Sequence, residues 1–407
     1  MVARMSAPDS LNLRSAAQIF SGLSDDEVFL LEQADRFARA ELYPLAQRMD
    51  DDEWWPPEAF AKIGANGYFG ITAPESLGGS GADLFTSGLV LQAFARWNHA
   101  LALSWVAHEN LCLHNLLRNA SAEQKARYVP ALASGNAVGA LGLTEPGAGS
   151  DALGSMRTTA VLDGDHYVLN GNKIYITNGA VADVLLVYAK TDKALGSQGI
   201  SAFIVDKDAP GFKVAQKLRK MGFRGSQTAE LVFDNCRVPA ANLVGGENAG
   251  VKVVMSGLDL ERAMIAPLCL GIAERALELS LDYARTREQF GKPIASFQMI
   301  QDKLAQMYVA VEAMRLFTYQ ALRAASALEH GDTMGRGEIH KLTAASVMFA
   351  ANTMNTVLDH AVQIHGGSGY IWESEVNRLY RAIKLLEIGA GTTEVRKLII
   401  SGEMLRG

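Results

Sequence analysis

Two abrupt changes of residue pattern, near residues 138 and 250, constrain the fold of this chain more than any other feature. On either side of the middle part, apolar residues recur at the spacing of amphipathic helices. The middle part instead holds short β-prone runs, separated by turn-forming pairs such as Asp163-Gly164 and Asn170-Gly171. Because no helical pattern lies between these runs, we expect an antiparallel barrel or sandwich there.

The chain is therefore predicted to have an α+β fold in three parts. These are an N-terminal all-α domain (1–137), a middle β-barrel or sandwich domain (138–244) and a C-terminal four-helix-bundle domain (245–407). Helices are expected over 25–47, from the Pro56-Pro57 pair to Gly64, and over 85–107, 122–133, 251–286, 298–329, 337–364, 373–387 and 392–405. Strands are expected over 138–143, 156–162, 166–169, 173–177, 184–189, 200–205, 212–215 and 230–233.

Composition excludes several classes of protein. The chain has 407 residues and is 49% apolar, so it can bury a large core and is not a disordered tail. Its net charge of −6 leaves no global basic field to hold a nucleic acid. Three cysteines lie far apart without CxxC spacing, so we expect neither a disulfide framework nor a metal site. The longest uncharged run, Leu342–Leu358, carries polar residues and is shorter than the roughly 20 residues of a membrane helix, so no membrane span is expected.

A glycine-rich segment, Gly147–Ala152, matches the GxGxxG/A pattern and follows an expected strand. A dinucleotide-binding loop of that type opens a helix, whereas Ser155–Leu162 is expected to continue as a strand, so the Rossmann reading is rejected. Glycines still allow backbone amides to approach a ligand closely, and Thr144 and Ser150 add hydroxyl groups. From spacing alone, a ligand-binding loop and a plain turn both remain open.

Glu261 is the most informative single residue. It lies on one helical stripe that is otherwise apolar and consists of Val254, Leu258, Glu261, Ile265, Leu268 and Ile272. A carboxylate on an inward stripe is costly unless it is paired or protonated. One reading is a rim glutamate paired with Arg262; the other is a general base whose pKa is raised by an apolar pocket. Pro267, further along, is expected to kink the helix and widen a gap behind Glu261.

Three further segments are candidates for binding. Arg285–Gly291 ends a helix with two cations, which favours either simple capping or a diphosphate site. His365 has no second ligand at metal spacing and is expected to be structural. Gly389–Glu394 opens the last helix, where Thr392 or Thr393 can cap it and its free amides can receive an anion or a carbonyl oxygen.

Five segments together resemble the signatures of the acyl-CoA dehydrogenase family, in the family's order: Leu143–Asp151, Ile176–Gly179, Arg285–Gly291, Gln363–Gly367 and Gly391–Glu394. The resemblance implies the cofactor FAD, an acyl-CoA substrate, electron-transfer flavoprotein as acceptor and a homotetramer built as a dimer of dimers. It also implies removal of an α proton and a β hydride to give a trans-2-enoyl-CoA. The expected location is the cytoplasm of a bacterium or the mitochondrial matrix of a eukaryote.

Most members of the family carry the catalytic glutamate just before the Gly-Thr of the last motif, where this chain has Ala390. A smaller branch, which includes the isovaleryl-CoA and long-chain enzymes, keeps it on an earlier helix, and Leu258–Arg262 resembles that helix in the isovaleryl-CoA dehydrogenases. The resemblance thus implies Glu261 as the base and isovaleryl-CoA or a similar branched short acyl-CoA as substrate. A longer or terpenoid (citronellyl-type) substrate, an acyl-CoA oxidase, and a scaffold without chemistry stay open as alternatives.

Matching positions imply the contacts of each ligand. Those expected at the flavin are Leu141, Thr144, Ser150, Tyr175, Ile176 and Thr177. Those expected at its diphosphate and adenosine, several of them across a subunit interface, are Arg287, Gln298, Gln363, Gly366, Gly367, Thr392 and Glu394. Those expected at the CoA thioester are Ser150, Asp259, Arg262, Ala390 and Gly391, with an amide near Gly391 polarising the thioester carbonyl.

The sequence also departs from the family at three places. Tyr175 stands where the family usually has a tryptophan that packs against the flavin. Pro267-Leu268 and Leu386 stand where isovaleryl-CoA dehydrogenases have a glycine pair and a tyrosine. Since the last two changes fall near the expected acyl pocket, Leu268 is expected to narrow one wall and Leu386 to open another.

Overall fold

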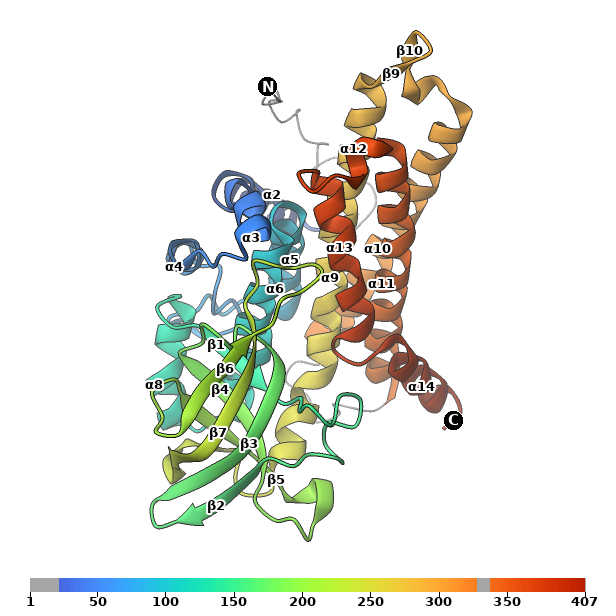
Figure 1. The fold of residues 1–407 in the computed structure, drawn as a ribbon. Coiled ribbons are helices and arrows are strands. Elements are labelled where there is room, and N and C mark those ends of the chain that lie inside the picture. Colours follow the sequence, from blue (N-terminus) through green and yellow to red (C-terminus); the bar gives the residue numbers. More distant parts are fainter. Residues whose placement is uncertain (1–21, 328–336, 407) are drawn as a thin grey trace.

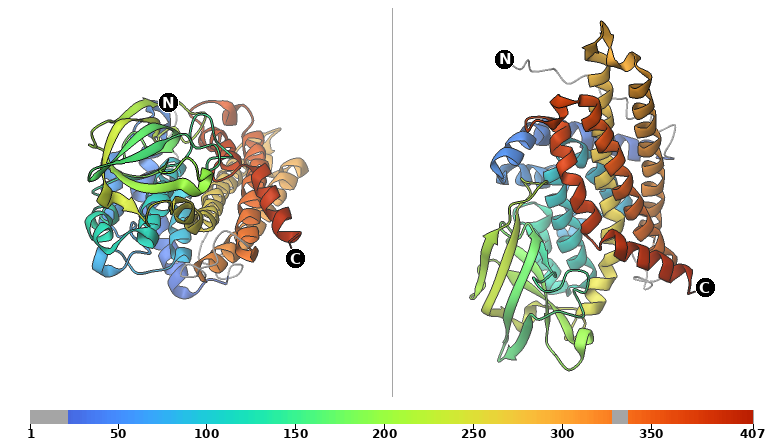
Figure 2. Two further views of the ribbon diagram at one scale, coloured as in Figure 1. Left: turned by 90° about the horizontal axis from the view of Figure 1, so that it is seen from below. Right: turned by 45° about the vertical axis from the view of Figure 1, so that its right-hand side comes forward.

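A layer of short helices, a β-sheet and a bundle of long helices lie around one central helix in the computed structural model, which describes residues 22–327 and 337–406 (Figure 1). The central helix, α9 (Gly250–Thr286), has the sheet beside its lower half and the N-terminal helices beside its upper half. Figure 2 shows from two further sides that α9 lies between these layers and the other long helices. The α+β architecture is therefore as predicted.

The N-terminal part begins at a capped helix. The Ser24 hydroxyl accepts a hydrogen bond from Glu27 N, and the Glu27 side chain accepts one from Ser24 N, which makes a complete capping box. The elements that follow are α2 (Asp25–Phe37), a π-helical turn η1 (Ala38–Leu42), a 3₁₀ turn η2 (Tyr43–Leu45), α3 (Ala46–Asp52), α4 (Pro57–Ala65), η3 (Glu75–Leu77), α5 (Leu84–Trp97), α6 (His99–Val106), a π-helix η4 (Ala107–His114), α7 (Asn115–Asn119) and α8 (Ala122–Ala133).

Two helix predictions in this part are wrong. The expected helix over 85–107 is interrupted at Asn98, whose backbone leaves the helical region (φ −147°, ψ 83°) and whose side chain accepts from Leu101 N to cap α6. The first helix, expected over 25–47, is not one regular helix. A π-helical turn and the 3₁₀ turn that contains Pro44 join α2 to α3, and α3 ends only at Asp52.

The middle part is an eight-stranded, mainly antiparallel sheet in the order β6-β7-β3-β2-β4-β5-β8, with β1 paired in parallel to β4. Its strands are β1 (Gly139–Gly142), β2 (Thr159–Asp163), β3 (His166–Thr177), β4 (Val184–Lys190), β5 (Ile200–Asp206), β6 (Phe212–Lys217), β7 (Thr228–Pro239) and β8 (Leu243–Val244). The predicted turn at Asn170-Gly171 is wrong, because β3 runs through it with a shift of register. A side chain at Gly171 would lie 2.7 Å from Thr158 Cα, so the glycine serves close strand packing.

The C-terminal part contains α9, a short hairpin of β9 (Glu288–Gln289) and β10 (Lys292–Pro293), η7 (Ile294–Ser296), α10 (Gln298–Ala327), α11 (Gly337–His365), α12 (Gly367–Tyr370), α13 (Glu375–Ile388) and α14 (Thr393–Met404). The predicted end of α10 at residue 329 lies outside the described residues. α9 runs unbroken through Pro267. No helix in the described ranges is both long and apolar enough to cross a bilayer.

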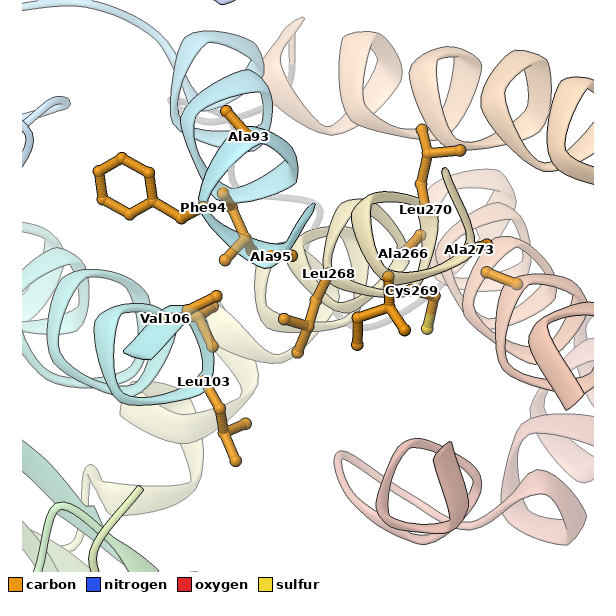
Figure 3. Packing of buried hydrophobic residues seen from close by; sticks show 14 of the residues in the cluster. Ala93, Phe94, Ala95, Leu103, Val106, Ala266, Leu268, Cys269, Leu270 and Ala273 are labelled. Atoms are coloured by element: carbon orange, nitrogen blue, oxygen red, sulfur yellow. The ribbon is translucent and has the colours of Figure 1, made fainter. Parts of the chain in front are cut away.

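The predicted domain boundaries, 137/138 and 244/245, fall between α8 and β1 and between β8 and α9. These boundaries remain proposals, because the three layers share one hydrophobic core. Figure 3 shows Val106 of α6 on the side of its helix toward Leu268 of α9, and Leu103 of α6 and Phe94 of α5 belong to the same apolar cluster. Helices from both ends of the chain are thereby joined in one packed interior.

Buried charges cross the same boundary. Arg96 of α5 pairs with Asp35 of α2 at 3.0 Å and with Glu278 of α9 at 3.2 Å, and all three side chains are buried. Arg275 of α9 in turn pairs with Glu278 at 2.8 Å and with Glu375 of α13 at 2.9 Å. Because each ion has an opposite charge within hydrogen-bond reach, the cost of removing it from water is offset.

Replacing Arg96 by methionine should therefore destabilise the protein strongly, because two buried carboxylates lose a counter-ion. We expect a loss of about 3–5 kcal/mol in the free energy of unfolding, measured by urea titration at one protein concentration. Arg237→Met is the matched control, since Arg237 pairs with Asp163 on the surface, and it should cost at most about 1 kcal/mol. Equal small losses in both variants would contradict the argument.

Candidate active site

Glu261 lies near the middle of the buried stripe of α9, as the sequence predicts. It is 9% exposed, and its Oε1 has no hydrogen-bond partner among the described residues. Burial raises the pKa of this carboxyl to about 7, against the opposing effect of Arg262 and with a smaller contribution from Asp259. A carboxyl with such a pKa can take up or release a proton near neutral pH.

Two polar side chains that sequence reasoning missed lie close to this carboxyl. A Cβ atom at Gly257, one turn before Glu261, would lie 3.2 Å from Glu261 Oε1 and 3.3 Å from Asn115 Nδ2. Asn115 Nδ2 also donates to the Tyr188 hydroxyl at 3.5 Å. Asn115 begins α7 and Tyr188 lies on β4, so three distant segments meet here. The available signal was weak: a tyrosine hydroxyl inside the otherwise apolar run 184–189.

A second cluster lies on the same turn of α9, at Asp259 and Arg262. Asp259 is fully buried and accepts from His340 Nδ1 of α11 at 2.6 Å and from Arg262 Nη1 at 3.3 Å. Arg262 Nη2 would be 3.9 Å from a Cβ atom at Gly391, while Arg262 Nε has no partner in the described part of the chain. The predicted thioester residues Asp259, Arg262 and Gly391 are therefore brought together, and His340 is an addition that spacing could not reveal.

The connection between α13 and α14 carries the last motif. Ala390 and Gly391 both have positive φ angles, of 55° and 89°, and the Thr392 hydroxyl accepts from Val395 N as the predicted cap of α14. Arg396 is fully buried and donates to the carbonyl oxygens of Leu386 at 2.9 Å and Gly389 at 2.6 Å. These two bonds hold the connection from inside the protein.

At the C-terminal ends of β1 and β3, and in the loop that follows β1, lies the predicted flavin group: Leu141, Thr144, Ser150, Tyr175, Ile176 and Thr177. Tyr175 is 67% exposed and has a φ angle of 62°, at a point where β3 and β7 shift register. Large residues in this backbone region are uncommon and cluster at functional sites. No helix follows the glycine-rich loop, so the rejection of a Rossmann loop is confirmed.

Glu145 anchors that loop and was not singled out from the sequence. It is buried, and it accepts from Lys173 Nζ at 2.9 Å, from Arg157 N at 2.7 Å and from Thr158 N at 2.9 Å. Burial alone would raise the pKa of Glu145, but the Lys173 ammonium and these hydrogen bonds hold it below its ordinary value. An ionised Glu145 thus fixes both ends of the segment that bears Thr144 and Ser150.

The structure does not bring all predicted cofactor residues together. Arg287, Gln298, Gln363, Gly366 and Gly367 are exposed and lie at the opposite end of the bundle, near β9 and α12 (Figure 1). Thr392 and Glu394 lie at the start of α14. His365 Nδ1 donates to Ala361 O at 2.8 Å, and the imidazole ring stacks on Tyr283 with ring centres 4.3 Å apart, which fits the structural role expected for it. In the described ranges, no group of three or more His, Cys, Asp or Glu could hold a metal ion.

Comparison with known proteins matches this arrangement to one family. The N-terminal, middle and C-terminal domain models of acyl-CoA dehydrogenase match residues 24–136, 140–236 and 248–405. The chain belongs to the acyl-CoA dehydrogenase family. It is therefore an oxidoreductase that acts on an acyl-CoA, as its sequence motifs implied.

Individual relatives of this acyl-CoA dehydrogenase are similar over nearly their full length. The mitochondrial isovaleryl-CoA dehydrogenase of Arabidopsis thaliana is 42% identical over 98% of this chain and 95% of the relative. The mitochondrial 2-methylacyl-CoA dehydrogenase of Solanum tuberosum is also 42% identical, with the same coverage. Among solved structures, the FAD complex of PigA is 30% identical and superposes with a TM-score of 0.88 over 95% of this chain and 99% of that one.

The residues at the end of β3 fit a flavin. Tyr175 presents an exposed aromatic ring on a backbone held in an uncommon conformation. Ile174 N donates to Thr144 O at 2.9 Å, which ties the loop that carries the Thr144 and Ser150 hydroxyls to this strand. The family is one of flavoproteins. The residues present are therefore suited to an aromatic cofactor with polar substituents.

The raised pKa of Glu261 should be measurable as a change of stability with pH. Its folded pKa of about 7 lies above the ordinary value of 4.5, so its contribution is fully present below pH 4.5 and is lost as the pH rises through 7. Glutamine stays neutral, so Glu261→Gln should become more stable than the wild type by about 3 kcal/mol above pH 8 and not below pH 5. Thermal unfolding of both proteins across this range tests it, with the exposed Glu58→Gln as control. A difference independent of pH would contradict the assignment.

Proposed function

We propose that this enzyme is an FAD-dependent dehydrogenase of a branched short acyl-CoA, with Glu261 as the base that removes the α proton. One observation carries the proposal: Glu261 is a buried carboxyl with an unpaired oxygen and a pKa of about 7, next to the turn that bears Arg262. Ala390, at the position where most of the family has its glutamate, has no group that can accept a proton. A base on α9 is the remaining candidate.

The other residues hold and orient the reactants. FAD, which accepts the β hydride when bound, is proposed to be lined by Leu141, Thr144, Ser150, Tyr175, Ile176 and Thr177. The thioester is proposed to contact Ser150, Asp259, Arg262, Ala390 and Gly391. Backbone amides near Gly391, at the beginning of α14, would stabilise negative charge on the thioester oxygen while Glu261 takes the proton.

A second copy of the chain is proposed to complete each flavin site. One group of residues lies at the end of the bundle away from Tyr175 (Figure 1): Arg287, Gln298, Gln363, Gly366 and Gly367. This distance supports the proposal that these residues, with Thr392 and Glu394, bind the diphosphate and adenosine of the flavin held by another copy. Exposed apolar side chains such as Met299 and Val309 of α10 and Leu398 of α14 support burial against other copies. We therefore keep the homotetramer, built as a dimer of dimers, as part of the proposal.

The electron acceptor and the compartment are proposed on the family resemblance. Electron-transfer flavoprotein is the proposed acceptor, with an oxidase reaction as the alternative. The two relatives described above are mitochondrial, which supports the mitochondrial matrix for a chain of eukaryotic origin. For a bacterial chain we propose the cytoplasm.

The acyl group is proposed to be isovaleryl or a similar branched short chain. Two relatives that are equally identical to this chain are named for isovaleryl-CoA and for 2-methylacyl-CoA, so a comparison of these two does not decide between the two substrates. Leu268 and Leu386 are both buried and are proposed to line the acyl pocket. A hydrophobic pocket distinguishes one methylene by only about 1–3 kcal/mol, so longer and terpenoid chains remain the alternative.

Replacing Glu261 by glutamine tests the base. The variant should still bind flavin, but substrate should bleach the flavin about 10²–10⁴-fold more slowly, because no group is left to take the α proton. Glu109→Gln is the matched control: Glu109 is also buried, burial raises its pKa to about 7, and it accepts from Gly70 N and Ile71 N away from the site. Wild-type bleaching by Glu261→Gln would exclude Glu261 as the base.

A panel of isovaleryl-, 2-methylbutyryl-, butyryl-, octanoyl- and citronellyl-CoA tests the acyl group. We expect the highest kcat/KM for isovaleryl-CoA or 2-methylbutyryl-CoA and a value at least about tenfold lower for octanoyl-CoA, because each misplaced methylene costs binding in the transition state. The assay uses an artificial electron acceptor. The best rate with citronellyl-CoA would favour the terpenoid alternative, and peroxide formed in air without an acceptor would favour the oxidase.

A further inference from the structure

The Glu261 side chain fills a space that a glycine leaves open. Side chains on a helix lean toward its N-terminus, and Glu261 Oε1 accordingly lies one turn back, where a Cβ atom at Gly257 would be 3.2 Å away. A glycine inside a helix costs about 1 kcal/mol relative to alanine. The three atoms nearest to that Cβ position belong to Glu261 and Asn115 alone.

Gly271, on the same helix, has a different reason to be glycine. A Cβ atom there would lie 2.2 Å from Gln92 O of α5, so Gly271 allows two helices to pack closely. At Gly257 no backbone of another element is among the nearest atoms. The small residue at Gly257 thus makes room for a carboxylate and an amide, not for a neighbouring helix.

The walls of this recess carry hydrogen-bond donors. Asn115 is 1% exposed and Tyr188 is fully buried. The Tyr188 oxygen accepts from Asn115 Nδ2 at 3.5 Å, so its own proton is available to another acceptor. Burial raises the pKa of the Tyr188 hydroxyl, and the nearby negative charge of Glu261 raises it further, so the hydroxyl keeps its proton.

We propose that Asn115 and Tyr188 are positioning residues that hold the Glu261 carboxylate in a resting position against Gly257, from which it turns toward the substrate. The inference rests on the proposed role of Glu261 as base. Glu261 Oε1 makes no hydrogen bond in the structure, but the Asn115 amide and the Tyr188 hydroxyl are donors beside the recess that holds it, and in the resting position they stabilise the ionised carboxylate electrostatically. When the carboxylate turns away from these two donors, it loses their stabilisation and becomes a stronger base as it faces the α carbon.

The other charged and titratable groups around Glu261 are the same in the wild type and in the variants proposed below. On α9 these are Arg262 and Asp259, and beyond Asp259 lies His340 of α11. On the opposite side Cys112 of η4 lies near Tyr188, and burial raises the pKa of its thiol to about 12, so it stays neutral. None of these groups is altered by a substitution at Tyr188 or Gly257.

Two substitutions should each move the acid limb of the kcat/KM profile upward. Tyr188→Phe removes a donor to the ionised carboxylate and should shift the limb upward by about one pH unit. Gly257→Ala fills the recess, displaces the carboxylate from Asn115 and Tyr188 and should also shift the limb upward, because the ionised form loses both donors. Tyr319→Phe, a buried tyrosine bonded to Gln92, and Gly402→Ala, a helical glycine with open space around it, should leave it unchanged.

Thermal unfolding gives a second readout that does not need turnover. Tyr188→Phe should lower the Tm more at pH 9 than at pH 6 in the wild-type background, and equally at both pH values in the Glu261→Gln background. An unmoved acid limb in Tyr188→Phe and Gly257→Ala, or an equal shift in the controls, overturns the inference while leaving the base assignment intact. Wild-type bleaching by Glu261→Gln would instead refute the proposed function.

Discussion

The enclosure of α9 is the constraint on which the rest of the structure depends. Of its 37 residues, 25 are buried, and helices or strands from every part of the chain pack against it. A helix enclosed in this way can keep charged side chains only if they find partners. Arg275 and Glu278 do so through Glu375 and Arg96, and these pairs fix how the N-terminal layer and α13 sit on α9. Glu261 keeps an unpaired oxygen on the same helix, so its environment differs in kind from that of the structural pairs.

Local patterns could predict the elements but not their interruptions. The expected helix over 122–133 agrees with α8, and the expected helix over 251–286 agrees with α9 to within a residue, because both have strong periodicity and clear ends. The break at Asn98 and the passage of β3 through Asn170-Gly171 depend on contacts with distant residues. Tertiary packing overrides local preference at such points.

In the candidate site, too, some residues could be predicted from the sequence and others could not. The inward position of Glu261 follows from the spacing of its own helix, so it could be found from the sequence. Asn115, Tyr188 and His340 come from α7, β4 and α11, and no local spacing links them to Glu261. Arg396 is similar: its partners are two carbonyl oxygens that become accessible only where α13 ends. Residues that position a functional group through non-local contacts leave little trace in a single sequence.

The length of α9 has a consequence for assembly. At about 1.5 Å per residue, the 25 residues of α9 that follow Glu261 span about 38 Å. The helix therefore keeps the proposed catalytic carboxyl far from the tip of the bundle within one chain. A ligand that contacted both within one chain would have to be about as long, which supports the proposal that a second copy completes each flavin site. If that proposal holds, subunits pulled apart would lose the complete site.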